Sequence, residues 1–283
     1  DQGTTGSGVT VGVIDTGALQ THEALRQQYR GYRGSTLDND YNWLDPEGYG
    51  NVPRWTNEHG THVTATIVGD NRNPDPAKRE RIGVAPGAQW ISCLALGTDS
   101  DQPRFMVECF QFMLAPTRIN GTLPDPDRRP DIVNNSWVSG GTCNGAGESI
   151  YQEMIEAWIA AGVLPVFAAG NTQNCDLPQP PGLSTVASPG SLPASFAVGS
   201  TGNHDGRYAT HSLWGPTAAS GAGAPGLPDP RGYPQLKPQV VAPGVSIRSA
   251  FSEGTPYAKL TGTSMSAPHV SGVFALMIEA GEC

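Results

Sequence analysis

The sequence predicts an α/β fold in which a central, mostly parallel twisted sheet carries helices on both faces. Short apolar runs rich in β-branched residues alternate along the chain with stretches whose apolar residues recur at helical spacing. The short runs are almost continuously hydrophobic, which is typical of parallel strands that are buried on both faces. A chain of 283 residues can bury one sizeable core, so we expect a single domain over residues 1–283.

The individual elements follow from these patterns. Buried strands are predicted at 9–14, 90–96, 131–135, 163–168 and 196–199. Helices are predicted at 60–69, 105–114, 148–161 and 264–280, and Gly162 and Gly281 are expected to end the last two. The segments 71–81, 116–130, 178–182 and 221–234 are rich in Pro, Gly, Asn or charged residues. We interpret them as surface loops because strand or helix signals resume after each.

Composition and charge exclude several classes of partner. The net charge is −9, and the densest basic spot, Arg128-Arg129, is interpreted as part of a solvated loop, so we expect no nucleic acid partner. No apolar run is long enough to span a bilayer, so we expect no membrane partner. A monomer is the simplest oligomeric state. The first residues lack the pattern of a signal peptide, which favours either a cytosolic protein or an already processed chain.

Five cysteines are spaced unlike any metal template, so no metal site is predicted from them. Cys143 and Cys175 lie in loop-like sequence, which is a common setting for a disulfide in an oxidising compartment. We therefore hypothesise the pairs 143–175 and 93–109, with Cys283 left over. Ordinary buried thiols remain the alternative.

Four polar residues interrupt apolar sequence at the end of a strand or the start of a helix: Asp15, His59, Asn171 and Ser264. In open α/β sheets, functional sites assemble at the carboxyl ends of the strands. A serine hydroxyl needs a base to remove its proton during attack, and an imidazole titrates in the useful range. We therefore expect Ser264 to be the nucleophile and His59 the general base.

The other two residues complete this chemistry. Asp15 is expected to hold His59 in the required tautomer and to stabilise its charged form. The side chain of Asn171 and the backbone N–H of Ser264, at a helix N-terminus, are expected to form the oxyanion hole.

These segments resemble the subtilisin-like serine proteases, or subtilases, whose motifs occur in the same order. The motifs are Val-Ile-Asp15-Thr-Gly, His59-Gly-Thr-His-Val, Ala-Ala-Gly-Asn171 and Gly-Thr-Ser264-Met-Ser-Ala-Pro, and the run Asn134-Asn-Ser-Trp137 is most similar to the bacillopeptidase F-like branch. The resemblance implies a subtilisin-like three-layer fold and a secreted serine endopeptidase that acts on proteins or peptides through an acyl-enzyme. It further implies broad specificity, no cofactor and an inhibitory pro-segment that is removed, with His62 as a structural residue.

The resemblance also maps the S1 pocket, which holds the P1 side chain preceding the cleaved bond. Ser136, Trp137 and Val138 correspond to one wall, and Ala168, Ala169 and Gly170 correspond to the other. Ala187 lies where the family often has a glycine at the base of the pocket, so a methyl group is expected to shorten it. None of these residues is charged, so we expect a medium or large apolar P1 residue rather than Arg or Lys.

Three departures from the family pattern stand out. Val138 replaces a common glycine, so the pocket wall is expected to be shaped differently. Ala24 replaces an acidic residue that binds calcium in many subtilases, and the loop after His62 is enlarged, so no metal site is carried over. Few residues follow Ser264, so we expect either a trimmed chain or another element that covers the last helix.

Each residue taken singly has a simpler interpretation. An Asp after a strand is usually a cap or a turn former, and His22, His204, His211 and His269 are interpreted as core histidines. The spacing of His59 and His62 lacks the acidic residue of a zinc motif. Two rival functions remain: a catalytically silent subtilase fold that serves as a binding module, and a processing protease of narrow specificity.

Overall fold

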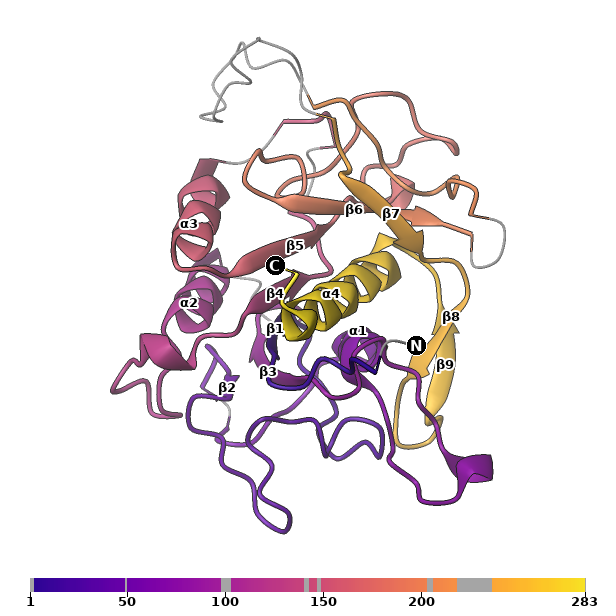
Figure 1. Cartoon of the computed structure of the whole chain (residues 1–283). Coiled ribbons are helices and arrows are strands. Elements are labelled where there is room, and N and C mark those ends of the chain that lie inside the picture. The colour runs from indigo at the N-terminus through magenta and orange to yellow at the C-terminus, as the bar shows by residue number, and fades with distance from the viewer. Residues whose placement is uncertain are drawn as a thin grey trace. The chain divides into compact units, whose positions relative to one another are not determined.

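The computed structural model describes residues 3–48, 50–97, 103–139, 143–146, 149–202, 206–217 and 236–282 (Figure 1). The chain forms two compact units. Unit 1 comprises residues 1–134, 248–259 and 271–283, and unit 2 comprises residues 135–247 and 260–270. Among the described residues, strands β2-β3-β1-β4 form the sheet of unit 1, apart from Asn135, and strands β5-β6-β7 form the sheet of unit 2. The predicted α/β class, with a mostly parallel sheet and helices, is confirmed.

Unit 1 is built on β1 (Thr10–Asp15), β2 (Trp43–Leu44), β3 (Gln89–Leu94) and β4 (Ile132–Asn135). Strand β1 runs parallel to β3, with Thr10 opposite Gln89 and Asp15 opposite Leu94. Every residue of β1 after Thr10 is buried, as expected for a strand covered on both faces.

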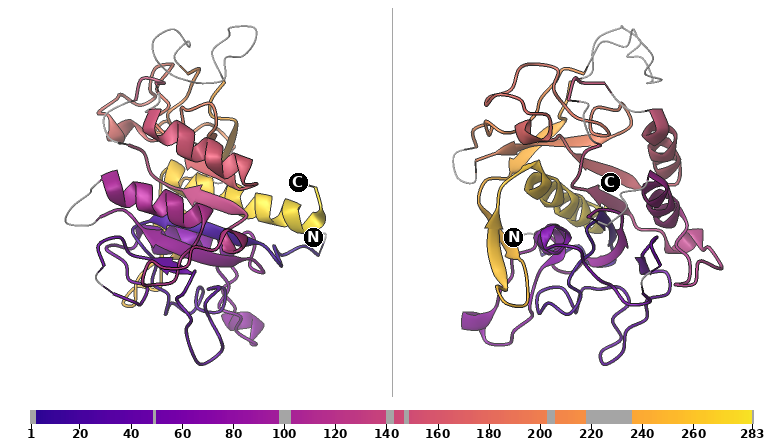
Figure 2. Two further views of the ribbon diagram at one scale, coloured as in Figure 1. Left: turned by 90° about the vertical axis from the view of Figure 1, so that its left-hand side faces the viewer. Right: turned by 180° about the vertical axis from the view of Figure 1, so that it is seen from behind.

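Helices α1 (His59–Val68) and α2 (Pro103–Leu114) cover opposite faces of this part of the sheet (Figures 1 and 2). A Cβ atom on Gly12 would lie 2.5 Å from the sulfur of Met113, so α2 packs directly on this residue of β1. Because side chains alternate along a strand, Asp15 points to the other face, where α1 packs. The backbone pattern therefore sets the side of the sheet on which the carboxylate acts.

Unit 2 contains the parallel strands β5 (Leu164–Ala168), β6 (Phe196–Thr201) and β7 (Val240–Pro243). Helix α3 (Ser149–Ala160) packs on β5 through the buried Trp158. Gly162 follows α3 with a φ of +81°, a conformation that glycine adopts without strain, and this agrees with the predicted helix stop.

Three elements contribute to both units: strands β8 (Ile247–Ala250) and β9 (Tyr257–Leu260), which form a two-stranded sheet, and helix α4 (Thr263–Ala280). Short 3₁₀ helices occur at η1 (Pro76–Lys78), η2 (Pro126–Arg128) and η3 (Thr172–Asn174). The start of the chain lies beside the end of α4 (Figure 2), where the Glu279 carboxylate accepts hydrogen bonds from the backbone N–H groups of Thr5 and Gly6 at 2.5 and 2.6 Å.

Both hypothesised disulfides are present. Cys93 in β3 pairs with Cys109 in α2, with a Cα–Cα distance of 5.6 Å, and Cys143 pairs with Cys175 at 6.0 Å. The leftover cysteine, Cys283, lies outside the described residues, as do His204 and the predicted loop at 221–234. Among the described residues, no helix combines the length and the apolar character needed to cross a membrane.

Candidate active site

Unit 1 brings together the predicted acid–base pair. Asp15 is the last residue of β1 and His59 is the first residue of α1, and His59 Nδ1 lies 2.8 Å from Asp15 Oδ1. Asp15 is fully buried, whereas the His59 side chain is 31% exposed. An ionised carboxylate can only accept hydrogen bonds, so Nδ1 carries the proton and the lone pair of Nε2 is left to act as a base.

Two neighbours hold this pair in place. Thr16 donates its N–H to Asp15 Oδ1 at 2.7 Å, and its hydroxyl accepts from the N–H of Gly60 at 2.9 Å. A Cβ atom on Gly60 would lie 2.0 Å from the carbonyl oxygen of Gly17, so only glycine allows α1 to approach β1 this closely. The motif residues next to Asp15 and His59 therefore set the spacing between the two functional groups.

The environment of His59 shifts its protonation. Burial lowers the pKa of His59, but the negative charge of Asp15 and the hydrogen bond to it raise the pKa by more, so the net pKa lies above the usual 6.5. The pair therefore stabilises the imidazolium form that a general base reaches after taking a proton.

Unit 2 holds the predicted nucleophile. Ser264 is the second residue of α4 and is half-buried. Its Oγ donates to the backbone carbonyl of Ser136 at 3.0 Å, and the Ser136 hydroxyl donates to the carbonyl of Ser264 at 2.9 Å. At this position the backbone N–H has no partner within the helix, so it can donate to a negative charge that develops next to the serine.

Asn171, the predicted oxyanion donor, follows the end of β5 and is also in unit 2. Its side-chain Oδ1 accepts hydrogen bonds from the Thr263 N–H at 2.9 Å and from the Thr263 hydroxyl at 3.1 Å. The same hydroxyl accepts from the N–H of Gly170 at 3.2 Å. Because two donors face Oδ1, the orientation of the amide is fixed, and the two N–H donors of Nδ2 are directed away from Thr263.

The residues mapped to the S1 pocket also come together in unit 2. The N–H of Ala187 donates to the carbonyl of Ala169 at 3.0 Å. A Cβ atom on Gly170 would touch the methyl group of Ala187 at 3.0 Å and Cγ1 of Val138 at 3.3 Å. Val138, Gly170 and Ala187 therefore line one small region, in which Val138 adds bulk where the family often has glycine.

Three of the mapped S1 residues turn their side chains into the interior. Trp137 is 7% exposed and packs edge-to-face on Phe167, with ring centroids 5.9 Å apart. Ala168 and Ala169 are buried as well. Any contribution of these three residues to a substrate site would therefore come from their backbone groups.

Sequence reasoning missed the residues that support the site, namely Thr16, Gly60, Thr263 and Asn174. The first three directly adjoin Asp15, His59 and Ser264 in the sequence, and this adjacency is the signal that could have found them. Asn174, whose Oδ1 accepts the N–H of Asn171 at 2.7 Å, carries no such signal, because this bond depends on a turn that only the structure shows.

Comparison with known proteins decides the family. The profile of the subtilase family (peptidase S8) matches residues 6–282. The chain belongs to the subtilase family. This subtilase is 39% identical to Bacillopeptidase F of Bacillus subtilis (strain 168) over 278 residues, which is 97% of this chain and 18% of that protein. It is 30% identical to an extracellular basic protease of Dichelobacter nodosus over 310 residues, which covers 99% of this chain and 44% of that protein.

Subtilisin E of Bacillus subtilis (strain 168) is 28% identical over 284 residues, covering 98% of this chain and 57% of that protein. The subtilase chain thus spans less than two thirds of the length of these relatives. A crystal structure described as a cold adapted subtilisin-like serine proteinase matches with a TM-score of 0.66 at 24% identity, covering 100% of this chain and 79% of that chain. This likeness confirms the predicted subtilisin-like fold.

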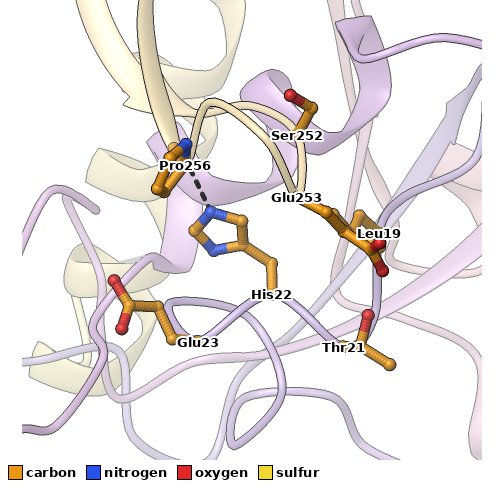
Figure 3. Close-up of a pocket in the computed structure, with 7 residues that line it drawn as sticks. All are labelled: Leu19, Thr21, His22, Glu23, Ser252, Glu253 and Pro256. Atoms are coloured by element: carbon orange, nitrogen blue, oxygen red, sulfur yellow. Dashed lines mark hydrogen bonds between the residues drawn. The ribbon is translucent and has the colours of Figure 1, made fainter.

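Unit 1 contains a cavity whose lining includes neither Asp15 nor His59. It measures about 300 Å³ and is lined by Leu19, Thr21, His22, Glu23, Ser252, Glu253 and Pro256 (Figure 3). His22 accepts the Ala24 N–H at Nδ1, at 3.1 Å, and its Nε2 donates to the carbonyl of Pro256 at 2.7 Å. Both ring nitrogens are thus bonded, which supports the interpretation of His22 as a core histidine that ties this loop to the turn between β8 and β9.

The other two described histidines that were interpreted as core residues, His211 and His269, differ from each other. His269 bonds through Nδ1 to the carbonyl of Met265 at 2.7 Å, as a core histidine should. His211 is half-buried, and among the described residues its Nε2 has no hydrogen-bond partner.

The bonds of His22 lead to a prediction about acid stability. Burial lowers the pKa of His22, and the Pro256 carbonyl and the charge of Glu23 offset part of this effect. His22 therefore becomes protonated at a lower pH in the folded state than in the unfolded chain. As a result, the free energy of unfolding should fall as the pH drops below about 6.5, by at most about 1.4 kcal/mol per pH unit. Denaturant titrations of wild type and His22→Gln between pH 8 and 5 measure this contribution. Equal pH slopes for the two proteins would contradict it.

The loop after α1 is held by hydrogen bonds and an ion pair of Asp70. The Asp70 carboxylate accepts from the Arg79 guanidinium, with 2.6 Å between Arg79 Nη2 and Asp70 Oδ2, and from the N–H of Arg72 at 2.8 Å. The N–H of Asp70 in turn bonds to the carbonyl of Ala24 at 3.0 Å. Burial raises the pKa of Asp70, but these bonds lower it by more, so the carboxylate stays ionised and paired with Arg79.

Proposed function

We propose that this subtilase is a secreted serine endopeptidase that cuts peptide bonds through Asp15, His59 and Ser264. The observation that carries the proposal is the 2.8 Å hydrogen bond between His59 Nδ1 and Asp15 Oδ1, which leaves Nε2 free to act as a base. The proposal requires Nε2 to come within hydrogen-bond reach of Ser264 Oγ. The order of the family motifs along the chain supports this arrangement.

In the proposed reaction, Ser264 Oγ attacks the carbonyl carbon of the scissile bond while His59 Nε2 takes its proton. The resulting oxyanion accepts hydrogen bonds from Asn171 Nδ2 and from the backbone N–H of Ser264. His59 then returns the proton to the leaving amine, and an acyl-enzyme remains on Ser264. Water, activated by His59, hydrolyses this ester and restores the serine.

Covalent labelling separates this function from a silent binding module. A fluorophosphonate reacts with a serine only if a base activates it, so we expect a mass increase of one adduct that maps to Ser264. An unmodified Ser264 in a folded protein would favour the binding module. Cleavage of only one of many protein substrates by the unlabelled protein would favour the processing protease of narrow specificity.

The substrate preference is proposed to be broad, with an apolar P1 residue. Val138, Gly170 and Ala187 form an uncharged region in unit 2, which offers no partner for a basic side chain. Comparing kcat/KM on peptides that differ only in a P1 Phe, Leu, Ala or Arg tests the preference. We expect Phe and Leu to exceed Arg, and a clear preference for Arg would overturn this part of the proposal.

Secretion, a single catalytic domain over residues 1–283, a monomeric state and a removed pro-segment are part of the same proposal. The two disulfides support secretion, since such bonds persist in oxidising compartments. Protein or peptide chains are the proposed substrates.

A further inference from the structure

The backbone that carries Asn171 is held by a side chain outside the proposed triad. The N–H of Asn171 donates to the side-chain Oδ1 of Asn174 at 2.7 Å, and the N–H of Asn174 donates back to the carbonyl of Asn171 at 2.9 Å. Asn171 stands in extended conformation immediately before η3, with φ −126° and ψ 151°. The backbone N–H and C=O groups of Asn171 are thus both bonded to Asn174, three residues later in the sequence.

The neighbouring backbone explains why these groups are available to Asn174. Gly170 and Thr172 pair with another segment, because the carbonyl of Gly170 accepts from the Leu213 N–H at 3.0 Å and the Thr172 N–H donates to the carbonyl of His211 at 2.8 Å. Asn171 itself lies opposite Ser212 in this antiparallel bridge. Alternate residues of an extended strand point their N–H and C=O groups to opposite sides, so those of Asn171 turn toward Asn174.

A disulfide-bonded cysteine comes directly after Asn174 in the sequence. Cys175, the next residue, is bonded to Cys143, and its N–H donates to the carbonyl of Thr172 at 3.2 Å. Asn174 is exposed, and an exposed hydrogen bond in a loop would by itself hold the backbone only weakly. The covalent link restricts the motion of the turn in which Asn174 lies, so the bond to Asn171 persists.

We propose that Asn174 is a positioning residue of the oxyanion hole and that the Cys143–Cys175 disulfide holds it in place. This inference rests on the proposed function of Asn171. Thr263 fixes the amide of Asn171 through Oδ1, whereas Asn174 fixes the backbone from which that side chain extends. Stabilisation of an oxyanion depends on donors that are aimed before the reaction starts, and a displacement of about 1 Å can cost up to a hundredfold in rate.

The test is a double-mutant cycle on the purified protease. Asn174→Ala should lower kcat about tenfold with little change in KM. The displaced Asn171 donor would stabilise the transition state less well, whereas it contributes little to binding of the ground state. Asn174→Asp keeps the acceptor oxygen, so it should retain most of kcat when salt screens its charge. Gln173→Ala, an exposed change in the same turn, is the matched control and should leave kcat unchanged.

The second arm of the cycle shows whether Asn174 acts through Asn171. Asn171→Ala should lower kcat about 10²- to 10³-fold, which is the size of this effect in subtilisin, and adding Asn174→Ala should then change nothing further. An equal loss in both backgrounds, or no loss in Asn174→Ala alone, would overturn the inference while leaving the proposed function intact. An unchanged kcat in Asn171→Ala would overturn the oxyanion assignment together with this inference.

The disulfide is tested separately. Replacing Cys143 and Cys175 together by serine should lower kcat at constant KM, and this loss should also vanish in the Asn171→Ala background. Circular dichroism and the melting temperature show whether the variant is folded at the assay temperature. A folded variant with the kcat of wild type would show that Asn174 needs no covalent support.

Discussion

Replacing Ser264 by alanine is expected to lower kcat about 10⁶-fold, the order known for the same loss in subtilisin, while the protein folds normally. The hydroxyl is the proposed point of attack, so no acyl-enzyme can form without it. The change removes one hydrogen bond, from Ser264 Oγ to the carbonyl of Ser136 at 3.0 Å, and leaves the helix backbone intact. Peptide hydrolysis, with active-site titration of wild type to fix the enzyme concentration, measures the effect.

Ser266→Ala is the matched control for this change. Ser266 lies in the same helix and is fully buried, and within the described residues its hydroxyl has no hydrogen-bond partner. Its loss should therefore leave kcat within about twofold and the melting temperature nearly unchanged. A Ser264→Ala variant that keeps even a hundredth of the wild-type rate would show that another residue is the nucleophile.

Asp15→Asn is expected to lower kcat about 10⁴-fold, by the reasoning that applies to the Asp of any such triad. An asparagine fits the same buried space but can present an N–H to His59 Nδ1. The imidazole would then carry its proton on Nε2, the atom that must act as the base. Steady-state kinetics at saturating peptide, with Ser264→Ala as the background rate, measure the loss.

The same substitution should shift the pH dependence. In wild type the Asp15 carboxylate raises the pKa of His59 above 6.5, so activity should fall as the pH drops through that raised pKa, because His59 is then protonated and cannot act as a base. Without the charge of Asp15, burial is left to lower the pKa, and the acid limb of kcat/KM should move to lower pH. An acid limb that stays in place would show that another group titrates.

The long elements of the fold could be predicted from the sequence because their apolar residues repeat with a clear period. Strand β1 and helix α4 were predicted to within two residues at each end. Strand β2 has only two residues, which is too few for a period to appear. Strand β7 was missed because it follows a loop rich in Gly and Pro and exposes Val240 and Val241, unlike the buried strands that were predicted.

The candidate site likewise contains some features that the sequence predicts and others that it does not. Asp15, His59, Asn171 and Ser264 could be predicted because each breaks an apolar pattern at the end of an element, and the order of their motifs indicated the family. The adjacency of Thr263 to Ser264 could mark it as a candidate, but its bonds to Asn171 could not be predicted, because they join residues that lie far apart in the sequence. Hydrogen bonds of this kind depend on the three-dimensional path of the backbone, which local patterns do not encode.

The close approach of Gly60 to the Gly17 carbonyl also limits which residues this subtilase can accept at position 60. A methyl group at position 60 would lie 2.0 Å from that oxygen and 3.1 Å from the carboxylate of Asp15. Random mutagenesis at this codon, followed by selection for milk-clearing colonies, should therefore return glycine alone. Gly34 serves as the comparison, because a Cβ atom there would meet nothing within 4 Å. This position should accept asparagine and other residues that tolerate its positive φ.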